Sequence, residues 1–298
     1  MPSEMAPDFT KLSLRNVEYN LVEHCNLSCS GCDHASPFMP KTFAALADFV
    51  QDFEALKEIA SLNSLYFVGG EPLLHPDLLS FLEESRRLAI ASRIVVWTNG
   101  VLLHQAPDRF WQSIDELVVT FYPNVHVRMR ADDLMAKCRA HGVSLLLNYI
   151  GRGPDRRGSE LRYVGEFQKT LLNREICDAP LVEKIFQRCE NKGCHTVYDG
   201  HFFKCSVAPF VPERLRLGGR RFEHSISDSV QLRGNTNLYR DLKAYLKSCA
   251  PLAACRFCLG TSGPPIEHRQ LNRKQRVFEM SEDDSEKIEW VRRTIDGG

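Results

Sequence analysis

The sequence has no long hydrophobic run, no surplus of charge of one sign and no internal repeat. None of its apolar runs approaches the roughly 20 residues that a transmembrane helix needs. The chain carries 38 basic and 38 acidic residues, which argues against nucleic acid or an anionic membrane as the partner. The first 16 residues, "MPSEMAPDFTKLSLRN", lack the basic stretch and apolar core of a secretory signal. We therefore expect a cytoplasmic protein.

Cysteine, in contrast, is abundant, with 11 among the 298 residues. Disulfides do not persist in a reducing compartment and an odd number cannot all pair, so clustered thiols indicate metal binding or catalysis. The densest group, Cys25, Cys29 and Cys32, lies in "LVEHCNLSCSGCDHASP". Three thiols leave a tetrahedral metal ion one ligand short. They suit an iron–sulfur cubane in which the protein holds three irons and the fourth stays open.

Residues 17–150 alternate between apolar runs and helical patterns. Strands are expected at 17–23, 64–72, 93–100, 116–123 and 143–150, with helices at 43–60, 75–91, 106–114 and 129–142. Near-continuous apolar strands separated by helices predict a parallel sheet that is covered on its faces. Five or more such units favour a complete or partial barrel, with its chemistry at the C-terminal ends of the strands.

The pattern changes after about residue 175. A hairpin is expected at 195–205, with Asp199-Gly200 as its two-residue turn. Residues 225–249 are expected to be mostly helical, and 281–295 form a helix with acidic residues early and arginines late. Glycine, proline and charged residues at 151–160 indicate a connector.

The C-x3-C-x2-C loop after the first strand resembles that of the radical S-adenosylmethionine (SAM) superfamily, and two further stretches support the resemblance. "GGEP" (69–72) ends the second strand and "TNG" (98–100) ends the third. The resemblance covers roughly residues 17–150 and implies an α/β fold with a partial (β/α)6 TIM-like barrel. It also implies that Cys25, Cys29 and Cys32 hold a [4Fe-4S] cluster, whose open iron is ligated by SAM as a co-substrate.

The same resemblance assigns contacts to SAM. The "GGEP" backbone would meet the methionine amino group, "TNG" the adenosyl group, and the end of the fifth strand the ribose. The residues are Gly69, Gly70, Glu71, Pro72, Thr98, Asn99 and Asn148. Glycine permits close approach of backbone to a ligand. The residue before the third cysteine is usually aromatic in the family, but here it is Gly31, so the adenine needs apolar cover from elsewhere.

Six further cysteines lie between residues 189 and 258. Four of them resemble the C-x9-15-G-x4-C pattern and later cysteine pair of twitch-type auxiliary domains, and these are Cys189, Cys205, Cys255 and Cys258. The resemblance implies a second [4Fe-4S] cluster, and a structural zinc site on the same thiols is the alternative. Cys194 fits worse, because only five residues separate it from Gly200.

These assignments divide the chain into three predicted parts. Residues 1–172 are the radical SAM partial barrel, 173–270 the small twitch-like domain and 271–298 a C-terminal helical tail. Among the remaining thiols, Cys138 and Cys177 are interpreted as packing residues. Cys249 ends a helix six residues before the cysteine pair, where a thiol serves as a spare ligand, a core residue or a hydrogen-atom donor.

The whole pattern resembles the compact radical SAM enzymes of aminoglycoside biosynthesis. This resemblance implies an epimerase that inverts a sugar carbon (C-5‴) and converts neomycin C to neomycin B, with Cys249 as hydrogen donor. Its partners would be the small-molecule aminoglycoside and an external one-electron reductant of the flavodoxin or ferredoxin type. The main rival is a radical SAM dehydrogenase of an aminocyclitol such as 2-deoxy-scyllo-inosamine. A third hypothesis is a non-catalytic, zinc-bound scaffold.

Overall fold

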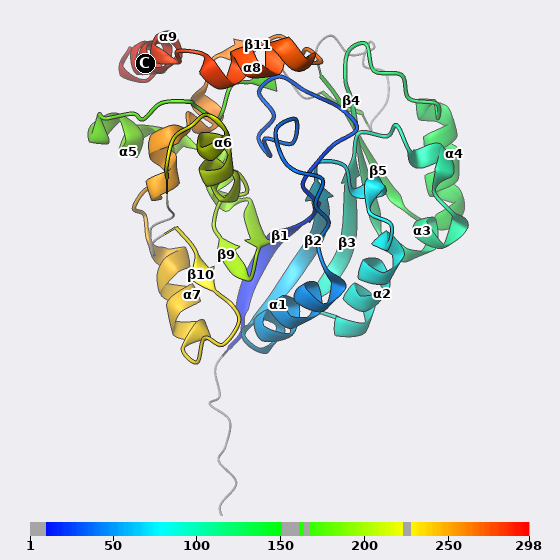
Figure 1. The fold of residues 1–298 in the computed structure, drawn as a ribbon. Coiled ribbons are helices and arrows are strands. Elements are labelled where there is room, and N and C mark those ends of the chain that lie inside the picture. The colour runs from blue at the N-terminus through cyan, green and yellow to red at the C-terminus, as the bar shows by residue number, and fades with distance from the viewer. Residues whose placement is uncertain (1–9, 151–160, 164–166, 223–227, 298) are drawn as a thin grey trace, which may run out of the picture.

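The computed structural model describes residues 10–150, 161–163, 167–222 and 228–297 (Figure 1). The predicted connector at 151–160 lies outside these residues. The strands are β1 (Leu12–Val22), β2 (Ala60–Gly69), β3 (Ala91–Thr98), β4 (Glu116–Phe121), β5 (Ser144–Tyr149), β6 (Leu161–Tyr163), β7 (Phe167–Gln168), β8 (His195–Tyr198), β9 (His201–Phe203), β10 (Val230–Gln231) and β11 (Pro265–Ile266). The α-helices are α1 (Leu46–Ile59), α2 (Leu78–Leu88), α3 (Asp108–Ser113), α4 (Ala131–His141), α5 (Ala179–Arg188), α6 (Val211–Leu217), α7 (Leu238–Lys247), α8 (Arg273–Ser281) and α9 (Ser285–Asp296).

Strands β1 to β6 follow one another across the main sheet, and each is parallel to the next. Helices α1 to α4 lie on the outer side of this parallel sheet (Figure 1). The α/β class and the partial barrel expected from the alternating pattern are therefore confirmed. The first two strands begin earlier than predicted, at Leu12 and Ala60, because the more polar starts of β1 and β2 pair with each other.

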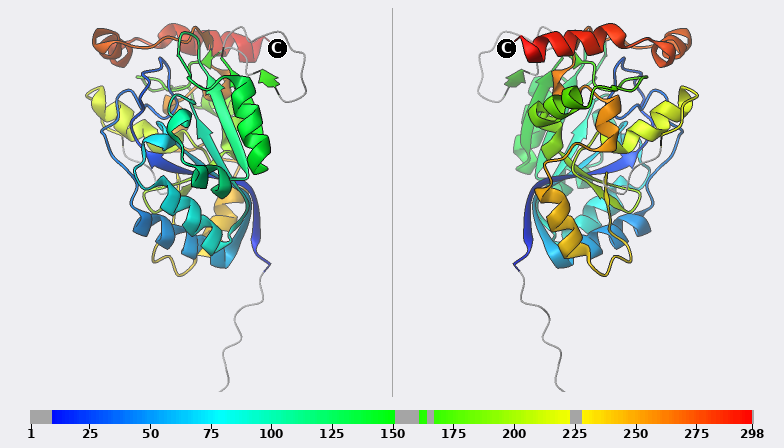
Figure 2. Two further views of the ribbon diagram at one scale, coloured as in Figure 1. Left: turned by 90° about the vertical axis from the view of Figure 1, so that its right-hand side faces the viewer. Right: turned by 90° about the vertical axis from the view of Figure 1, so that its left-hand side faces the viewer.

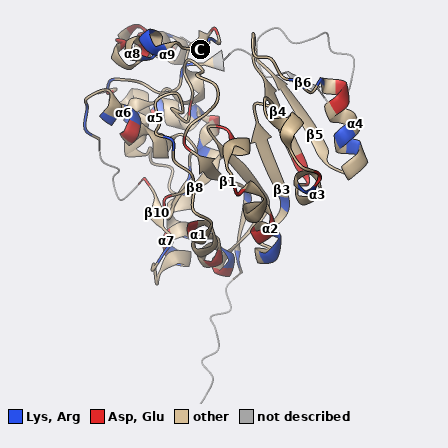
Figure 3. Cartoon of the chain, turned by 45° about the vertical axis from the view of Figure 1, so that its right-hand side comes forward, with Lys and Arg blue, Asp and Glu red and all other residues tan. Residues whose placement is uncertain are grey.

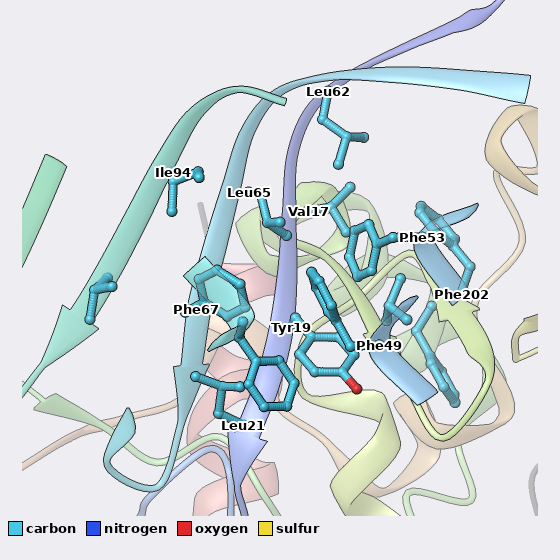
Figure 4. Packing of buried hydrophobic residues seen from close by; sticks show 14 of the residues in the cluster. Val17, Tyr19, Leu21, Phe49, Phe53, Leu62, Leu65, Phe67, Ile94 and Phe202 are labelled. Atoms are coloured by element: carbon cyan, nitrogen blue, oxygen red, sulfur yellow. The ribbon is translucent and has the colours of Figure 1, made fainter. Parts of the chain in front are cut away.

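The core lies between the parallel strands and the helices, and alternation along β1 builds one side of it. Val17, Tyr19 and Leu21 are buried together on the face that meets α1 (Figure 4). The Tyr19 ring packs edge-on against Phe49, with 4.9 Å between the ring centroids. Fully burying such a side chain contributes about 1.5–3 kcal/mol, so the interlocked rings fix how β1 sits against α1. Glu18 and Asn20, which alternate with these residues, lie on the other face of β1.

The sheet continues beyond the barrel strands into the C-terminal half of the chain. Strand β8 is parallel to β1, and β9 and β10 extend the same sheet antiparallel. Between β8 and β9, Asp199 and Gly200 have φ values of 47° and 73°, as a two-residue hairpin turn requires. The predicted hairpin is therefore confirmed.

The predicted helix at 225–249 is wrong for its first part. In the described residues from 228 onward, Val230 and Gln231 form β10 and pair with β9, and the helix α7 begins only at Leu238. Gly234, with a φ of 70°, lies in the intervening turn. The apolar residues do have helical spacing, but this segment forms backbone hydrogen bonds with the edge of β9 and is therefore a strand.

The C-terminal helices cross one end of the molecule, at the side where the barrel strands end (Figure 2). Helix α9 buries Val291 and Ile295 in a small apolar cluster with Leu181 and Ile185 of α5. Helices α2, α4 and α6 each carry both acidic and basic residues, and on α4 the acidic residues lie in the first turn and the basic ones toward the last (Figure 3). No helix formed by the described residues is long and apolar enough to cross a membrane. The boundaries at residues 172 and 270 stay a prediction.

Candidate active site at the ends of the barrel strands

The first cysteine loop leaves the end of β1 and brings three thiols together. Burial raises the pKa of Cys25 and of Cys29 to about 12, and the neighbouring thiols of the loop add to both shifts. Burial also raises the pKa of Cys32. Thiols in such surroundings become thiolates only when a cation neutralises them, and a bound metal does so outright. The donor set therefore fits the cubane that the sequence predicts.

Glu71 joins the "GGEP" and "TNG" segments into one structure. Its carboxylate is fully buried and accepts hydrogen bonds from the Thr98 hydroxyl at 2.7 Å and the Asn99 backbone N–H at 2.9 Å. It also accepts from the Leu73 backbone N–H at 3.0 Å. Burial raises the pKa of Glu71, and these three donors oppose that shift. One carboxylate thus fixes the ends of β2 and β3 relative to each other.

The two glycines of "GGEP" allow the chain to pack against itself. Gly69 has a φ of 142°, and an added Cβ would lie 2.6 Å from the Val22 carbonyl oxygen. A Cβ at Gly70 would lie 1.9 Å from the carbonyl oxygen of His24, at the start of the cysteine loop. The sequence predicted glycines for close approach to a ligand. In the structure the close approach is to the backbone that carries Cys25.

The asparagines expected near SAM lie at the same end of the sheet. The Asn99 side-chain amide donates to Asn26 Oδ1 at 2.7 Å and lies 3.5 Å from Cys25 Sγ. Asn148 is 3% exposed, and its side-chain oxygen has no hydrogen-bond partner among the described residues. Asn20 of β1 is also buried, and within the part of the chain that the structure describes neither amide atom of its side chain has a partner. Buried polar atoms without partners are rare, so these groups are available to a bound ligand.

The C-terminal segment covers the cysteine loop, which sequence reasoning missed. The Ser30 backbone N–H donates to the Arg269 carbonyl oxygen at 2.9 Å. The Glu279 carboxylate of α8 accepts from the Ser30 hydroxyl at 2.8 Å and the Gly31 N–H at 3.1 Å. Gly31 has a φ of 68°, which explains glycine at this position. No motif in the sequence marks this contact. Glu279 is the one residue of α8 that is buried, and it is polar, so the helix shows no apolar stripe that would predict its place.

An aromatic residue stands close to the loop even though Gly31 replaces the usual one. Tyr122 follows β4, and the thiols of Cys29, Cys32 and Cys25 add to the burial that raises its pKa. The Tyr122 ring stacks on His268, with 4.6 Å between the centroids. Apolar cover for an adenine ring is therefore present beside the loop.

The second group of cysteines is assembled from three separate segments. Cys189 follows α5, Cys205 follows β9, and the pair Cys255 and Cys258 lies in and after the short 3-10 helix η5 (Ala253–Phe257). Burial raises the pKa of Cys258 well above its usual value, and the thiols of Cys205, Cys255 and Cys189 add to the shift. Burial likewise raises the pKa of Cys255 to about 12. The four thiols that the twitch pattern selected thus lie near one another.

The remaining thiols differ from one another in exposure. Cys138 is 1% exposed in α4 and is a packing residue as predicted, but Cys177 is exposed, so its packing role is wrong. Cys177 lies in the irregular segment just before α5, where the preceding Ile176, and not Cys177, is buried in the apolar cluster. Cys194 is half-buried, and burial followed by the Glu18 carboxylate raises its pKa to about 11.

Cys249 is exposed just after α7, and its thiol lies 3.8 Å from the Lys247 carbonyl oxygen. Lys204 lies near Cys249. Its buried ammonium donates to the carbonyl oxygen of the preceding residue, Ser248, at 2.9 Å. Burial lowers the pKa of Lys204, and the thiols of Cys249 and Cys255 oppose that shift. The described contacts of Cys249 are thus on the side of the second group.

The arrangement does not form an evident site for a single metal ion. Within the described residues, no three His, Cys, Asp or Glu side chains are grouped so as to hold one ion.

Comparison with known proteins gives a match over most of the barrel. Residues 19–149 match the model described as the radical SAM superfamily. Over 171 residues the chain is 32% identical to "Molybdenum cofactor biosynthesis protein 1" from Dictyostelium discoideum, covering 54% of this chain and 25% of that protein. Over 147 residues it is 36% identical to "PqqA peptide cyclase" from Gluconobacter oxydans, covering 44% of this chain and 39% of that protein. The alignments thus span well under half the length of these relatives.

Among solved structures, the chain is similar to "BtrN in complex with AdoMet and 2-DOIA". The identity is 17% and the TM-score is 0.47, with 85% of this chain and 96% of that chain covered. A second similar structure is "Streptococcus suis SuiB bound to precursor peptide SuiA", at 12% identity and a TM-score of 0.39. That match covers 67% of this chain and 62% of the other.

Proposed function

Because residues 19–149 belong to the radical SAM superfamily, we propose that this radical SAM enzyme is an epimerase of aminoglycoside biosynthesis. It inverts one sugar carbon, C-5‴, and converts neomycin C to neomycin B. The reaction removes the hydrogen at that carbon on one face and returns a hydrogen on the other. SAM is consumed as a co-substrate. The substrate class rests on the resemblance of the whole cysteine pattern to the compact aminoglycoside enzymes.

The proposed first site uses the thiols of Cys25, Cys29 and Cys32 as ligands of a [4Fe-4S] cluster. When bound, this cluster would supply the electron that cleaves SAM into methionine and a 5′-deoxyadenosyl radical, and the auxiliary cluster would supply the electron that, with a proton from solvent, restores the thiol of the hydrogen donor. The "GGEP" and "TNG" segments, fixed to each other by Glu71, bind SAM. Asn148 offers its unpartnered oxygen to the ribose, and Tyr122 gives the adenine its apolar cover.

The single observation that favours inversion is the position of Cys249. Inversion needs a hydrogen donor distinct from the group that abstracts, because the two act on opposite faces. Cys249 is an exposed thiol outside both proposed ligand sets, and the Lys204 ammonium interacts electrostatically with both Cys249 and Cys255 of the auxiliary group. An S–H bond is weak enough to give a hydrogen atom to a carbon radical. We assign this transfer to Cys249.

The proposal includes a second [4Fe-4S] cluster on Cys189, Cys205, Cys255 and Cys258, within a small domain of residues 173–270. The mutual proximity of these thiols supports it. The electrons come from an external reductant of the flavodoxin or ferredoxin type. We propose no membrane or nucleic-acid partner and a cytoplasmic location, in keeping with the balanced charge of the chain.

The reaction is tested by incubating the reconstituted protein anaerobically with SAM, a reductant and neomycin C. An epimerase gives a product of unchanged mass, with one deuterium at the inverted carbon when the solvent is deuterated water. A product two hydrogens lighter would replace this proposal with the aminocyclitol-type dehydrogenase. A colourless protein that contains zinc and no iron would favour the scaffold.

The role of Cys249 is tested by Cys249→Ala. The variant should still cleave SAM and transfer the substrate's hydrogen into 5′-deoxyadenosine, yet form no inverted product. Cys177→Ala is the matched control, since Cys177 is also an exposed thiol outside the proposed ligand sets. Normal epimer formation by the Cys249 variant would remove the donor assignment.

A further inference from the structure

We propose that Gln270 is a positioning residue of the first cluster, which donates a hydrogen bond to the Cys29 ligand and raises the reduction potential of that cluster. The inference rests on the proposed ligation by Cys25, Cys29 and Cys32. It adds to that site a residue from the C-terminal part of the chain, 241 positions away from Cys29.

The orientation of the Gln270 amide is determined by its neighbours. Its oxygen lies 2.7 Å from the Ser28 backbone nitrogen, and its nitrogen lies 3.3 Å from Cys29 Sγ. A backbone N–H can only donate, so the amide oxygen must face Ser28. The NH2 group is therefore the part that faces the sulfur. The same nitrogen lies 3.3 Å from His268 Nε2. Because an amide NH2 group can only donate, its second hydrogen points to this imidazole nitrogen.

The backbone holds Gln270 in register with the cysteine loop. Gln270 and Cys29 form an isolated antiparallel bridge. On either side of it, Ser30 N–H donates to the Arg269 carbonyl oxygen at 2.9 Å and Leu271 N–H donates to the Ser28 carbonyl oxygen at 2.7 Å. A one-residue slip would turn the side chain to the opposite face and remove the contact.

Two further contacts brace this segment against the rest of the site. On one side, His268 stacks on Tyr122, which is anchored at the end of β4. On the other side, Glu279 of α8 accepts from Ser30 and Gly31 and lies 3.7 Å from the buried Arg214 guanidinium. Gln270 is itself exposed, so its place depends on these neighbours rather than on burial.

Such a hydrogen bond acts on the potential through charge. A thiolate ligand carries more negative charge when its cluster is reduced, so an N–H donor stabilises the reduced form more than the oxidised form. Hydrogen bonds to cluster sulfurs and their surroundings are among the means by which a protein sets the potential. Removing the donor should lower the potential. Placing a carboxylate there should lower it further, because the added negative charge opposes reduction.

The test compares Gln270→Leu and Gln270→Glu with the wild-type protein in a redox titration of the first cluster followed by electron paramagnetic resonance. Gln270→Glu keeps an acceptor for the Ser28 N–H, loses the donor to Cys29 and adds a negative charge. The matched control is Gln275→Glu, which adds the same charge five residues along. It preserves the capping box of α8, because Glu also serves at that position. We expect the potentials to fall in the order wild type, Gln270→Leu, Gln270→Glu, with Gln275→Glu close to wild type.

An unchanged potential in both Gln270 variants, with the cluster intact, would overturn the inference and leave the proposed function standing. If the wild-type protein binds no cluster after reconstitution, the proposed function fails as well. A readout independent of any cluster is alkylation of the metal-free protein. Gln270→Leu should lower the rate at Cys29 several-fold relative to Cys25, because the thiolate is the form that reacts and it loses a hydrogen-bond donor. Gln275→Glu should leave the ratio of the two rates unchanged. The same ratio of Cys29 to Cys25 alkylation rates in Gln270→Leu and Gln275→Glu would show that Gln270 does not contact Cys29.

Discussion

The two groups of cysteines in this protein are built in opposite ways. Cys25, Cys29 and Cys32 lie within eight positions on one loop, so the local chain alone brings them together. The other group spans residues 189 to 258 and comes from the end of α5, the end of β9 and the region of η5. The first group is a motif, and the second is a product of folding.

The difference shows in what each group requires of distant residues. Around Cys189, Gly260 has a φ of 56°, and an added Cβ would lie 2.8 Å from the Cys189 sulfur. Leu171 bridges to Cys258 through the backbone. The scattered group thus depends on tight packing among its segments. The first loop keeps its thiols together without help but depends on β2, β3 and the C-terminal segment for its surroundings.

The largest expected effect comes from the compact group. Replacing any one of Cys25, Cys29 or Cys32 with alanine should abolish SAM cleavage, because the cubane loses a ligand. The measurement is the amount of 5′-deoxyadenosine formed under reducing conditions. The triple variant should keep about four irons per chain at the second group. Production of 5′-deoxyadenosine at the wild-type rate by a single variant would contradict the assignment.

The scattered group is tested by comparing one of its proposed ligands, Cys258, with Cys194, a nearby thiol outside the proposed set. Cys258→Ala should lose about four irons per chain, because a four-thiolate cluster loses one ligand, whereas Cys194→Ala should keep them. Anaerobic analysis of iron, sulfide and zinc provides the measurement. If iron were lost from the Cys194 variant and not from the Cys258 variant, Cys194 would be the ligand and Cys258 would not. Zinc in place of iron would favour the structural zinc site.

A smaller effect is expected at Glu18, which lies on β1 between the two groups. Glu18 pairs with Thr196 of β8, and burial together with the Asp33 carboxylate raises its pKa from 4.5 to about 8. The folded protein therefore holds this proton more tightly than the unfolded chain. The resulting stabilisation is complete below about pH 4.5 and is lost as the pH rises to about 8.

Melting temperatures of wild type and Glu18→Gln between pH 4.5 and 8 test this shift. The wild-type protein should lose stability relative to the variant as the pH rises, since one pKa unit corresponds to about 1.4 kcal/mol. Glu116→Gln is a control, because Glu116 is a strand glutamate that already pairs with Arg93 on the surface. Melting curves for Glu18→Gln that stay parallel to wild type at every pH would show that Glu18 keeps its usual pKa.

Much of the fold could be predicted because its signals are local. The strands of the barrel are apolar runs, and the hairpin turn is specified by Asp199 and Gly200. The start of β10 was mistaken for helix because helical spacing in the sequence does not reveal that β9 has a free edge. The sequence of α8 does not predict its place over the cysteine loop, because its one buried residue is the polar Glu279 and no apolar stripe marks a packed face.

Local patterns were enough to predict the compact thiol loop, the "GGEP" and "TNG" segments and their order at successive strand ends. These features depend on spacing over a few residues and on the rule that parallel strands end at one edge of a sheet. The links that Glu71 makes between "GGEP" and "TNG", and the cover that Gln270 and Glu279 give to the cysteine loop, appear only in the folded chain. Such contacts join residues far apart in the chain, and no local pattern marks them because they arise from the packing of whole elements.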